Sequence, residues 1–265
     1  MKNKQPLISI VTVVYNGEEF LEKTIQSVIN QTYKNIEYII IDGGSSDRTV
    51  DIIKKYENKI DYWVSEKDAG IYDAMNKGLD IATGDFVNFM NGGDSFYTNN
   101  TVSAAVAMMD SYATSYFGRA EVISDYSSWL HPSAKIDKTM IDMWLKKEAP
   151  NHQATFFPKV FYKKEKYNLE YNIFADGDYK NRAKFMHGFC FLDIIICKFE
   201  FGGISSSFDS YKHVIMMMKE AWNMGLQQKR VLFSIKRIFI YNIKYVLQTV
   251  FGERILLKLL RRYRG

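Results

Sequence analysis

Apolar residues in the first hundred positions follow two alternating patterns. Short, almost entirely apolar runs rich in β-branched residues predict strands that are covered on both faces of a sheet. They lie at Leu7–Tyr15, Ile36–Asp42, Asp61–Ser65 and Phe86–Met90. Between them, Glu18–Asn30 and Asp47–Asn58 carry apolar residues at helical spacing. This alternation predicts right-handed βαβ units and an α/β fold with a mainly parallel central sheet.

The pattern weakens after Ser95, where we expect a helix, two strands near Tyr116–Ile123 and Tyr126–His131, and a helix containing Met140–Leu145. A chain of 265 residues is long enough for one sizeable α/β domain with an appendage, but too short for two such domains. We therefore predict a main domain at residues 1–210 and a helical C-terminal extension at residues 211–265.

Positive charge is concentrated near the C-terminus. The chain has a formal net charge of +5, yet the segment from Lys229 to Gly265 holds ten Lys or Arg residues against one Glu. Charges interrupt its apolar runs before the roughly 20 residues needed to span a bilayer. The pattern predicts basic amphipathic helices on an anionic membrane surface. A helix packed on its own domain is the alternative, and no recognition motif accompanies the charge to favour nucleic-acid binding.

The N-terminus predicts a location in the cytoplasm. Polar and basic residues, Met1–Pro6, precede the apolar run Leu7–Tyr15, which ends without a small-residue cleavage pattern, so we interpret the run as a strand rather than a signal peptide. The two cysteines, Cys190 and Cys197, lack the spacing of a zinc site, and we expect both to be buried reduced thiols.

Polar residues follow each of the four predicted strands. Parallel sheets of this kind bind ligands at the carboxyl ends of their strands. The four strand ends carry Tyr15-Asn16-Gly17, the acidic and glycine-rich segment Asp42–Asp47, Ser65–Asp68, and Asn91-Gly92-Gly93-Asp94. We therefore expect one ligand site along this edge, with Tyr15, Asn16 and Asn91 among its nucleotide-binding residues.

Two segments have the chemistry of a nucleotide pocket. Asp42 stands where a carboxylate could accept a hydrogen bond from the imide N–H of uracil or thymine, whereas the residues after it could serve only as a turn and helix cap. Asp73, Asn76 and Lys77 recur at helical spacing and either face solvent or line the pocket. In the pocket, Lys77 would offset phosphate charge.

The segment from Asn91 to Asp94 is the candidate metal site. A divalent cation that bridges a diphosphate needs only one or two protein carboxylates, because phosphates and water supply the remaining ligands. The two glycines would let the diphosphate approach the backbone closely. A plain turn is the alternative.

Together these motifs resemble the inverting glycosyltransferases of family 2, particularly those of bacterial exopolysaccharide, colanic-acid and O-antigen assembly, which share the single-domain GT-A fold. The resemblance covers roughly residues 7 to 210. It rests on VTVVYNG at Val11–Gly17, DGGSSDRT at Asp42–Thr49, SEKDAGIYDAMNKG at Ser65–Gly78, ATGDF at Ala82–Phe86, NGGD at Asn91–Asp94, NHQ at Asn151–Gln153, ADGD at Ala175–Asp178 and GGIS at Gly202–Ser205.

The resemblance implies roles for individual residues. It implies that Asp42 and Asp68 contact the nucleoside, and that Asp94 is the last acid of a D-x-D region that binds Mg²⁺ or Mn²⁺. Asn91 and Gly93 stand where acids often stand in that region. Either the affinity for the metal is then low, or His152 completes the metal site. The alternative is that His152 is only a hydrogen-bonded histidine near the start of a strand.

The resemblance also implies a general base. Family members place it in an E-D motif whose Asp matches Asp176, which lies in an aromatic-flanked loop before a short helix containing Arg182. An inverting displacement needs a base opposite the leaving diphosphate to take the proton of the acceptor hydroxyl. We assign Asp176 to this role with Asp178 in reserve, although both residues could simply cap the helix.

We therefore expect an enzyme at the inner face of the cell membrane that moves a sugar, UDP-linked by preference, to a lipid-linked saccharide of a bacterial surface polysaccharide. Loops far apart in the chain must then bring Asp94 within one sugar's width of Asp176. A noncatalytic nucleotide-sugar-binding or scaffold protein is the alternative suggested by Gly93. A sugar nucleotidyltransferase would need a G-x-G-x-R-like loop where Tyr15–Glu18 stands.

Overall fold

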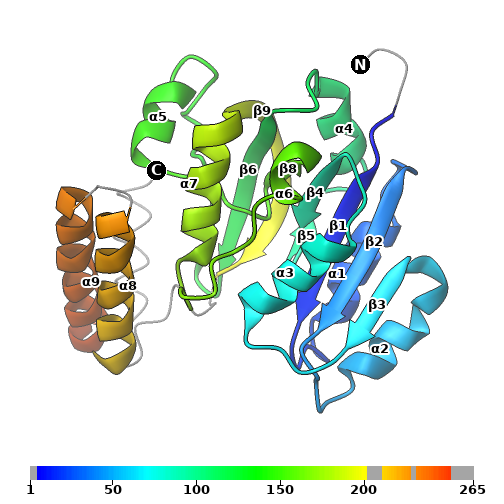
Figure 1. The fold of residues 1–265 in the computed structure, drawn as a ribbon, viewed down its shortest axis with the longest axis horizontal. Helices are drawn as coiled ribbons and strands as arrows, with labels where there is room; N and C mark the ends of the chain where they lie inside the picture. The colour runs from blue at the N-terminus through cyan, green and yellow to red at the C-terminus, as the bar shows by residue number, and fades with distance from the viewer. Residues whose placement is uncertain (1–4, 202–210, 228–230, 252–265) are drawn as a thin grey trace.

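A computed structural model describes residues 5–201, 211–227 and 231–251 (Figure 1). In these residues nine strands form one sheet in the order β3-β2-β1-β4-β8-β6-β9-β5, with β7 paired to β6. The strands are β1 Ile8–Val14, β2 Ile36–Asp42, β3 Tyr62–Ser65, β4 Phe86–Phe89, β5 Ser95–Phe96, β6 Ser115–Ser124, β7 Ser127–His131, β8 Thr155–Pro158 and β9 Phe189–Glu200. The helices are α1 Leu21–Ile29, α2 Thr49–Lys55, η1 Glu57–Lys59, α3 Ile71–Ile81, α4 Thr101–Met108, α5 Ile141–Lys147, α6 Lys159–Tyr162, α7 Ala175–His187, α8 Tyr211–Gln227 and α9 Val231–Phe251.

The predicted α/β fold class is confirmed. Strands β3, β2, β1 and β4 pair in parallel, as the alternation of strands and helices predicted. Beyond β4 the sheet becomes mixed, because β8 runs antiparallel to both β4 and β6, whereas β9 runs parallel to β6. The parallel half brings four carboxyl strand ends to one edge of the sheet.

Both faces of the sheet are covered, which explains the continuous apolar character of the first strands. In β1, Val11 and Val13 point to a core that also contains side chains of α3, α6 and α7. Ile8 and Ile10 of the same strand point to a second core on the opposite face, formed with α1, α2 and α4. Successive side chains of a strand point to opposite faces, so every position of a central strand is buried.

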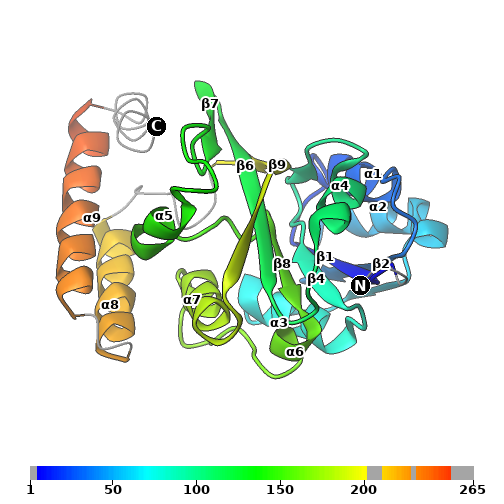
Figure 2. The same cartoon turned by 90° about the horizontal axis from the view of Figure 1, so that it is seen from above.

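Helices α8 and α9 pack side by side at the end of the molecule opposite β3 (Figures 1 and 2). Val214, Met217 and Ala221 of α8 are buried in the same core as α3 and α7. No helix in the described parts of the chain is long and apolar enough to cross a membrane. The predicted boundary at residue 210, the Gly202–Ser205 motif and the basic residues after 251 lie outside the described residues.

The expectation for the cysteines holds for one of them. Both thiols are free, but only Cys197 is buried, whereas Cys190 is exposed. Cys190 precedes the buried Phe191 on β9, and strand alternation turns neighbouring side chains to opposite faces.

Candidate active site

The loops that follow β1 and β2 are tied together by Asn16. Its backbone N–H donates to Ser45 Oγ at 2.7 Å, and its side-chain oxygen accepts a hydrogen bond from the Ser46 backbone at 2.9 Å. Asn16 adopts a positive φ of 48°, a left-handed conformation that asparagine tolerates better than most residues. The loop therefore turns sharply and leaves Tyr15 64% exposed at the edge of the sheet.

Asp42 is fully buried at the end of β2 and organises the neighbouring loops. Its carboxylate accepts hydrogen bonds from the backbone N–H of Ser45 at 3.0 Å and from Ser65 Oγ at 2.6 Å, and also from the Ser45 hydroxyl. These contacts join the ends of β2 and β3. In this structure the Asp42 carboxylate therefore faces protein groups rather than solvent.

Asp68 lies beside Gly43, on the more accessible side of the same edge. A methyl group on Gly43 would stand 2.6 Å from Asp68 Oδ2 and 3.4 Å from the ring of Tyr15. The glycine therefore allows Asp68 and Tyr15 to approach the backbone of β2 together. An aromatic face beside a carboxylate suits a nucleobase, which can stack on the ring and donate an N–H.

The three polar residues of α3 have different environments. Asn76 exchanges two hydrogen bonds with the backbone of Tyr167, at 2.9 and 2.8 Å, so it anchors a distant loop. Lys77 lies 2.7 Å from Glu66 and 3.9 Å from Asp73, whose carboxylate also accepts the Ala69 N–H. Lys77 and Asp73 remain partly exposed near the strand ends, whereas Asn76 is committed to a structural contact.

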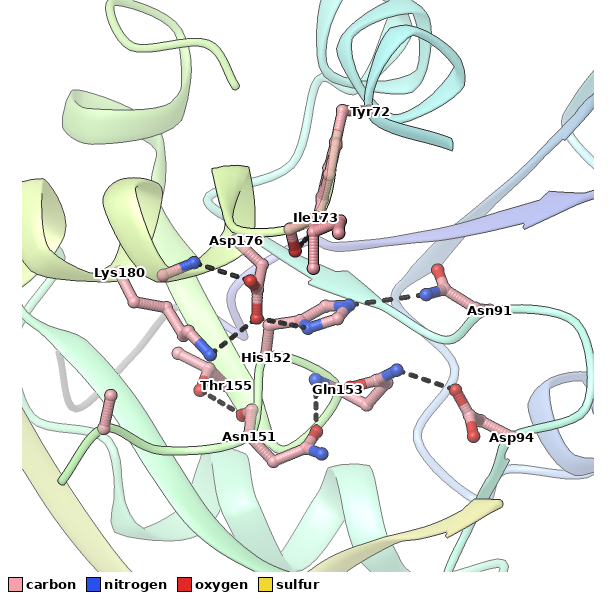
Figure 3. Close-up of polar contacts among 12 residues, drawn as sticks. Tyr72, Asn91, Asp94, Asn151, His152, Gln153, Thr155, Ile173, Asp176 and Lys180 are labelled. Carbon is pink, nitrogen blue, oxygen red and sulfur yellow. Dashed lines mark hydrogen bonds and ion pairs between the residues drawn. The ribbon is translucent and has the colours of Figure 1, made fainter. Parts of the chain in front are cut away.

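Asp176 belongs to a polar network that draws on three segments of the chain (Figure 3). Its Oδ2 lies 2.8 Å from Lys180 Nζ and 3.7 Å from His152 Nδ1. The other ring nitrogen of His152, Nε2, lies 3.3 Å from Asn91 Nδ2 at the end of β4. The network thus connects α7 with the candidate metal loop.

The expectation that Asp176 and Asp178 lie in a loop before a short helix is wrong. Helix α7 begins at Ala175 and extends to His187, so both acids lie in its first turn, where the helix dipole stabilises negative charge. Gly177 lowers the intrinsic helix propensity here, but tertiary contacts override it. Asp178 pairs with Arg182 one turn later, at 2.9 Å, and so has a different partner from Asp176.

Gln153 connects the same network to Asp94. Its Nε2 donates to Asp94 Oδ2 at 2.8 Å, while Asp94 Oδ1 accepts the Glu200 backbone N–H at 3.1 Å. Asp94 and Asp176 are therefore contacted by two consecutive residues, Gln153 and His152. Segments separated by more than fifty positions converge at this point, as Figure 3 shows.

The carboxyl groups at the two ends of this network titrate differently. Burial raises the pKa of Asp94 to about 7, and hydrogen bonds from Glu200 and Gln153 offset only part of the effect. Burial also acts to raise the pKa of Asp176, but Lys180 and His152 together outweigh burial and hold that pKa well below its ordinary value. Burial lowers the pKa of His152, which is therefore neutral at neutral pH.

The side chains of Asn91 and Asp94 offer oxygen donors of the kind that a divalent cation binds. Within the described residues, no group of three or more His, Cys, Asp or Glu side chains could hold a metal. The Asn91 side-chain oxygen is buried without a hydrogen-bond partner, and the hydrogen-bond donors to Asp94 are uncharged. One carboxylate and one amide oxygen are a sufficient protein contribution when phosphates supply other ligands. His152 was the other expected metal ligand, but in this structure its two ring nitrogens face the side chains of Asp176 and Asn91.

Sequence reasoning missed two side chains of this network. Lys180 stands one helical turn after Asp176, and residues four apart on a helix are neighbours. A predicted helix that started at Ala175 would therefore have indicated this pair. Gln153 lies within the quoted NHQ motif, but only the fold shows that its amide reaches Asp94.

Comparisons with known proteins agree with this architecture. The family model "Glycosyl transferase family 2" matches residues 9–177, more than half of the chain. An uncharacterized glycosyltransferase of Mycobacterium tuberculosis is 29% identical over 242 residues, which are 88% of each protein. A PGL/p-HBAD biosynthesis glycosyltransferase of Mycobacterium bovis is 29% identical over 215 residues, covering 76% of this chain and 80% of that protein.

Two solved structures share the fold. Residues 1–349 of S. aureus TarS in complex with UDP superpose with a TM-score of 0.63 at 16% identity, covering 93% of this chain and 76% of that chain. The mannosyltransferase PcManGT of Pyrobaculum calidifontis, in complex with GDP-Man and Mn²⁺, gives a TM-score of 0.58 at 12% identity, covering 98% of this chain and 75% of the mannosyltransferase. The chain therefore belongs to glycosyl transferase family 2 and is a glycosyltransferase with the GT-A fold.

Proposed function

We propose that this enzyme transfers a sugar from a UDP-sugar to a lipid-linked saccharide with inversion at the anomeric carbon. The observation that carries the proposal is the network in which His152 and Gln153 join the ionised Asp176 to the buried Asp94. Two consecutive residues thus link a candidate base to a candidate diphosphate-binding group. A single displacement needs both groups, with the base on the side of the anomeric carbon opposite the leaving diphosphate.

In the proposed reaction, the acceptor hydroxyl oxygen bonds to the anomeric carbon as the bond from that carbon to the diphosphate oxygen breaks. The hydroxyl proton passes to Asp176. Lys180 keeps Asp176 ionised and fixes its direction, since the two side chains lie 2.8 Å apart within α7. Neutral His152 contacts the same carboxylate oxygen and aligns it toward the metal loop. Asp178, paired with Arg182, is the reserve candidate for the base.

The donor nucleotide is proposed to bind at the edge formed by Tyr15, Gly43 and Asp68. The exposed ring of Tyr15 offers a stacking surface, and the Asp68 carboxylate offers an acceptor for an N–H or a ribose hydroxyl. Asn16 and Asp42 shape this edge through their contacts with Ser45, and Asp73 and Lys77 lie nearby on α3. The nucleotides in the TarS and PcManGT complexes, UDP and GDP-Man, support a nucleoside-diphosphate donor.

Asp94 and Asn91 would hold a Mg²⁺ or Mn²⁺ ion with the donor. The ion would neutralise charge on the leaving diphosphate when it is bound. Asp94 supplies a carboxylate whose hydrogen-bond donors are neutral, and Asn91 supplies a buried oxygen that lacks a partner. Gly92 and Gly93 let the backbone of this loop pack against Val14 and Phe20, because a methyl group on Gly92 would stand 3.1 Å from Val14 and 3.2 Å from Phe20.

Attachment to the cytoplasmic face of the membrane is proposed through the C-terminal extension. The outer helix α9 carries a stripe of exposed apolar side chains at helical spacing: Leu232, Ile235, Phe239, Ile243, Val246 and Val250. Exposed Lys236 lies on the same helix, and more basic residues follow in the sequence. An apolar stripe with basic neighbours suits the interface of an anionic bilayer, which would bring a lipid-linked acceptor to the enzyme.

Cosedimentation with vesicles tests the membrane attachment. Full-length protein with Phe239→Ser and Ile243→Ser should lose binding to phosphatidylglycerol vesicles, whereas Thr249→Ala on the same helix should not. Unchanged binding of the double variant would contradict the membrane proposal.

A donor screen tests the proposed activity. Nucleotide sugars that bind should raise the melting temperature by mass action, and UDP-sugars should do so more strongly with Mn²⁺ or Mg²⁺ than without. Donors that bind are then tested for UDP release with lipid-linked saccharides. Donor binding without turnover of any acceptor would favour the scaffold alternative.

A further inference from the structure

Glu220 of α8 connects the C-terminal helices to the backbone immediately before the candidate base. Three consecutive backbone N–H groups, those of Asn172, Ile173 and Phe174, donate to its carboxylate at 2.8, 3.0 and 3.2 Å. Glu220 is only 5% exposed. Successive N–H groups that converge on one anion form a defined concave site, which fixes the backbone around it. Here the anion is a side chain from 46 or more residues further along the chain.

The same segment is held from two other helices. The carbonyl of Ile173 accepts a hydrogen bond from the Tyr72 hydroxyl of α3 at 2.6 Å (Figure 3). The ring of Phe174 stacks on Tyr241 of α9, with centroids 5.7 Å apart and planes 10° from parallel. Segment 172–174 is therefore clamped between α3, which follows the nucleotide edge, and the hairpin of α8 and α9.

Helix α7 begins at Ala175, directly after this clamp, and Asp176 is its second residue. A shift of the clamped backbone therefore changes where the first turn of α7 starts and where the Asp176 carboxylate points. The contacts of Asp176 with Lys180 and His152 depend on that direction.

We propose that Glu220 is a positioning residue of the transfer site. It holds segment 172–174 so that Asp176 meets the acceptor hydroxyl in line with the donor, which makes the C-terminal hairpin part of the catalytic scaffold as well as a candidate membrane contact. The inference rests on the proposed function for the role of Asp176. The three hydrogen bonds to the Glu220 carboxylate come from the segment before Asp176 and not from Tyr15, Asp68 or Asp94, so Glu220 acts through the proton-accepting side.

Full-length Glu220→Gln and Glu220→Ala variants test this role, with Lys219→Gln as the control at the adjacent exposed position of α8. We expect Glu220→Ala to lower kcat about tenfold to a hundredfold, because small misplacements of a catalytic group have effects of this size. Glu220→Gln should lose less, since one carbonyl oxygen still accepts two of the three N–H groups. The donor KM and the UDP affinity measured by calorimetry should stay within about twofold, as should every parameter of Lys219→Gln.

Equal kcat for wild type and Glu220→Ala would overturn the inference. A loss of UDP affinity that matches the loss of kcat would also overturn it, because a parallel loss indicates general unfolding. Amide hydrogen exchange provides a second measurement that does not need turnover. Glu220→Gln, which preserves side-chain volume, should speed exchange at residues 172–174 and in the first turn of α7, but not in α3. If wild type turns over no donor, the proposed function fails, and unchanged exchange in Glu220→Gln would separately refute the clamp.

Discussion

The donor edge and the base side of the site are assembled from very different lengths of chain. The donor edge lies between residues 15 and 77 and is formed by loops that follow parallel strands and by helix α3. The base side joins His152, Asp176 and Glu220, which lie on a turn and two helices, and Gln153 links it to Asp94. The donor edge therefore follows from sheet topology, whereas the base side depends on tertiary contacts. Substitutions on the two sides should then separate donor binding from turnover.

The largest expected effect belongs to Asp176. Asp176→Asn should lower kcat by about 10²-fold to 10⁴-fold, the range of a general base, while the UDP affinity stays near that of wild type. Asp178→Asn is the matched control in the same helical turn, and its loss should be much smaller. Steady-state kinetics with calorimetry of UDP binding measures both. A larger loss in Asp178→Asn would transfer the role of base to that residue.

A glycine substitution probes the donor edge with a smaller effect. The methyl group of Gly43→Ala would meet Asp68 at 2.6 Å and force its carboxylate away. We expect UDP to bind about tenfold more weakly, a change of about 1.4 kcal/mol, with little change in kcat. Gly177→Ala is the control on the base side, because a methyl group there meets no atom within 4 Å. Unchanged UDP affinity in Gly43→Ala would remove Asp68 from the proposed donor site.

The sequence predicted the donor edge far better than the base side, for a physical reason. Strands β1 to β4 are local, nearly continuous apolar runs, so their ends mark the position of Asp42 and Asn91. The start of α7 has weak local signals, because Gly177 disfavours a helix and the segment before it is fixed by Glu220 from far along the chain. No local pattern could reveal that contact, and Lys180 was missed with it.

The last prediction concerns stability and pH rather than activity. The folded pKa of Asp94 is about 7 against an ordinary 3.8, so the folded state binds this proton more tightly than the unfolded state. The resulting stabilisation is full below about pH 4 and is lost as the pH rises through 7. The free energy of unfolding of wild type should therefore fall between pH 5 and 8 relative to Asp94→Asn, by at most about 3 kcal/mol.

Urea unfolding of wild type and Asp94→Asn in chelator-treated buffer across this pH range measures the difference. A difference that does not vary with pH would contradict the buried, raised-pKa state of Asp94. Mn²⁺ with UDP should restore wild-type stability most strongly at pH 8, where the carboxylate is ionised and free to bind the ion.

In the proposed mechanism, Asp176 drives a single displacement on a donor held at the opposite edge of the site. Proton NMR of the product, formed by wild type from a UDP-sugar that supports turnover, tests it most directly through the anomeric configuration of the transferred sugar. A single displacement gives the configuration opposite to that of the donor, with only UDP and the glycoside as products. A product that keeps the donor configuration would contradict it.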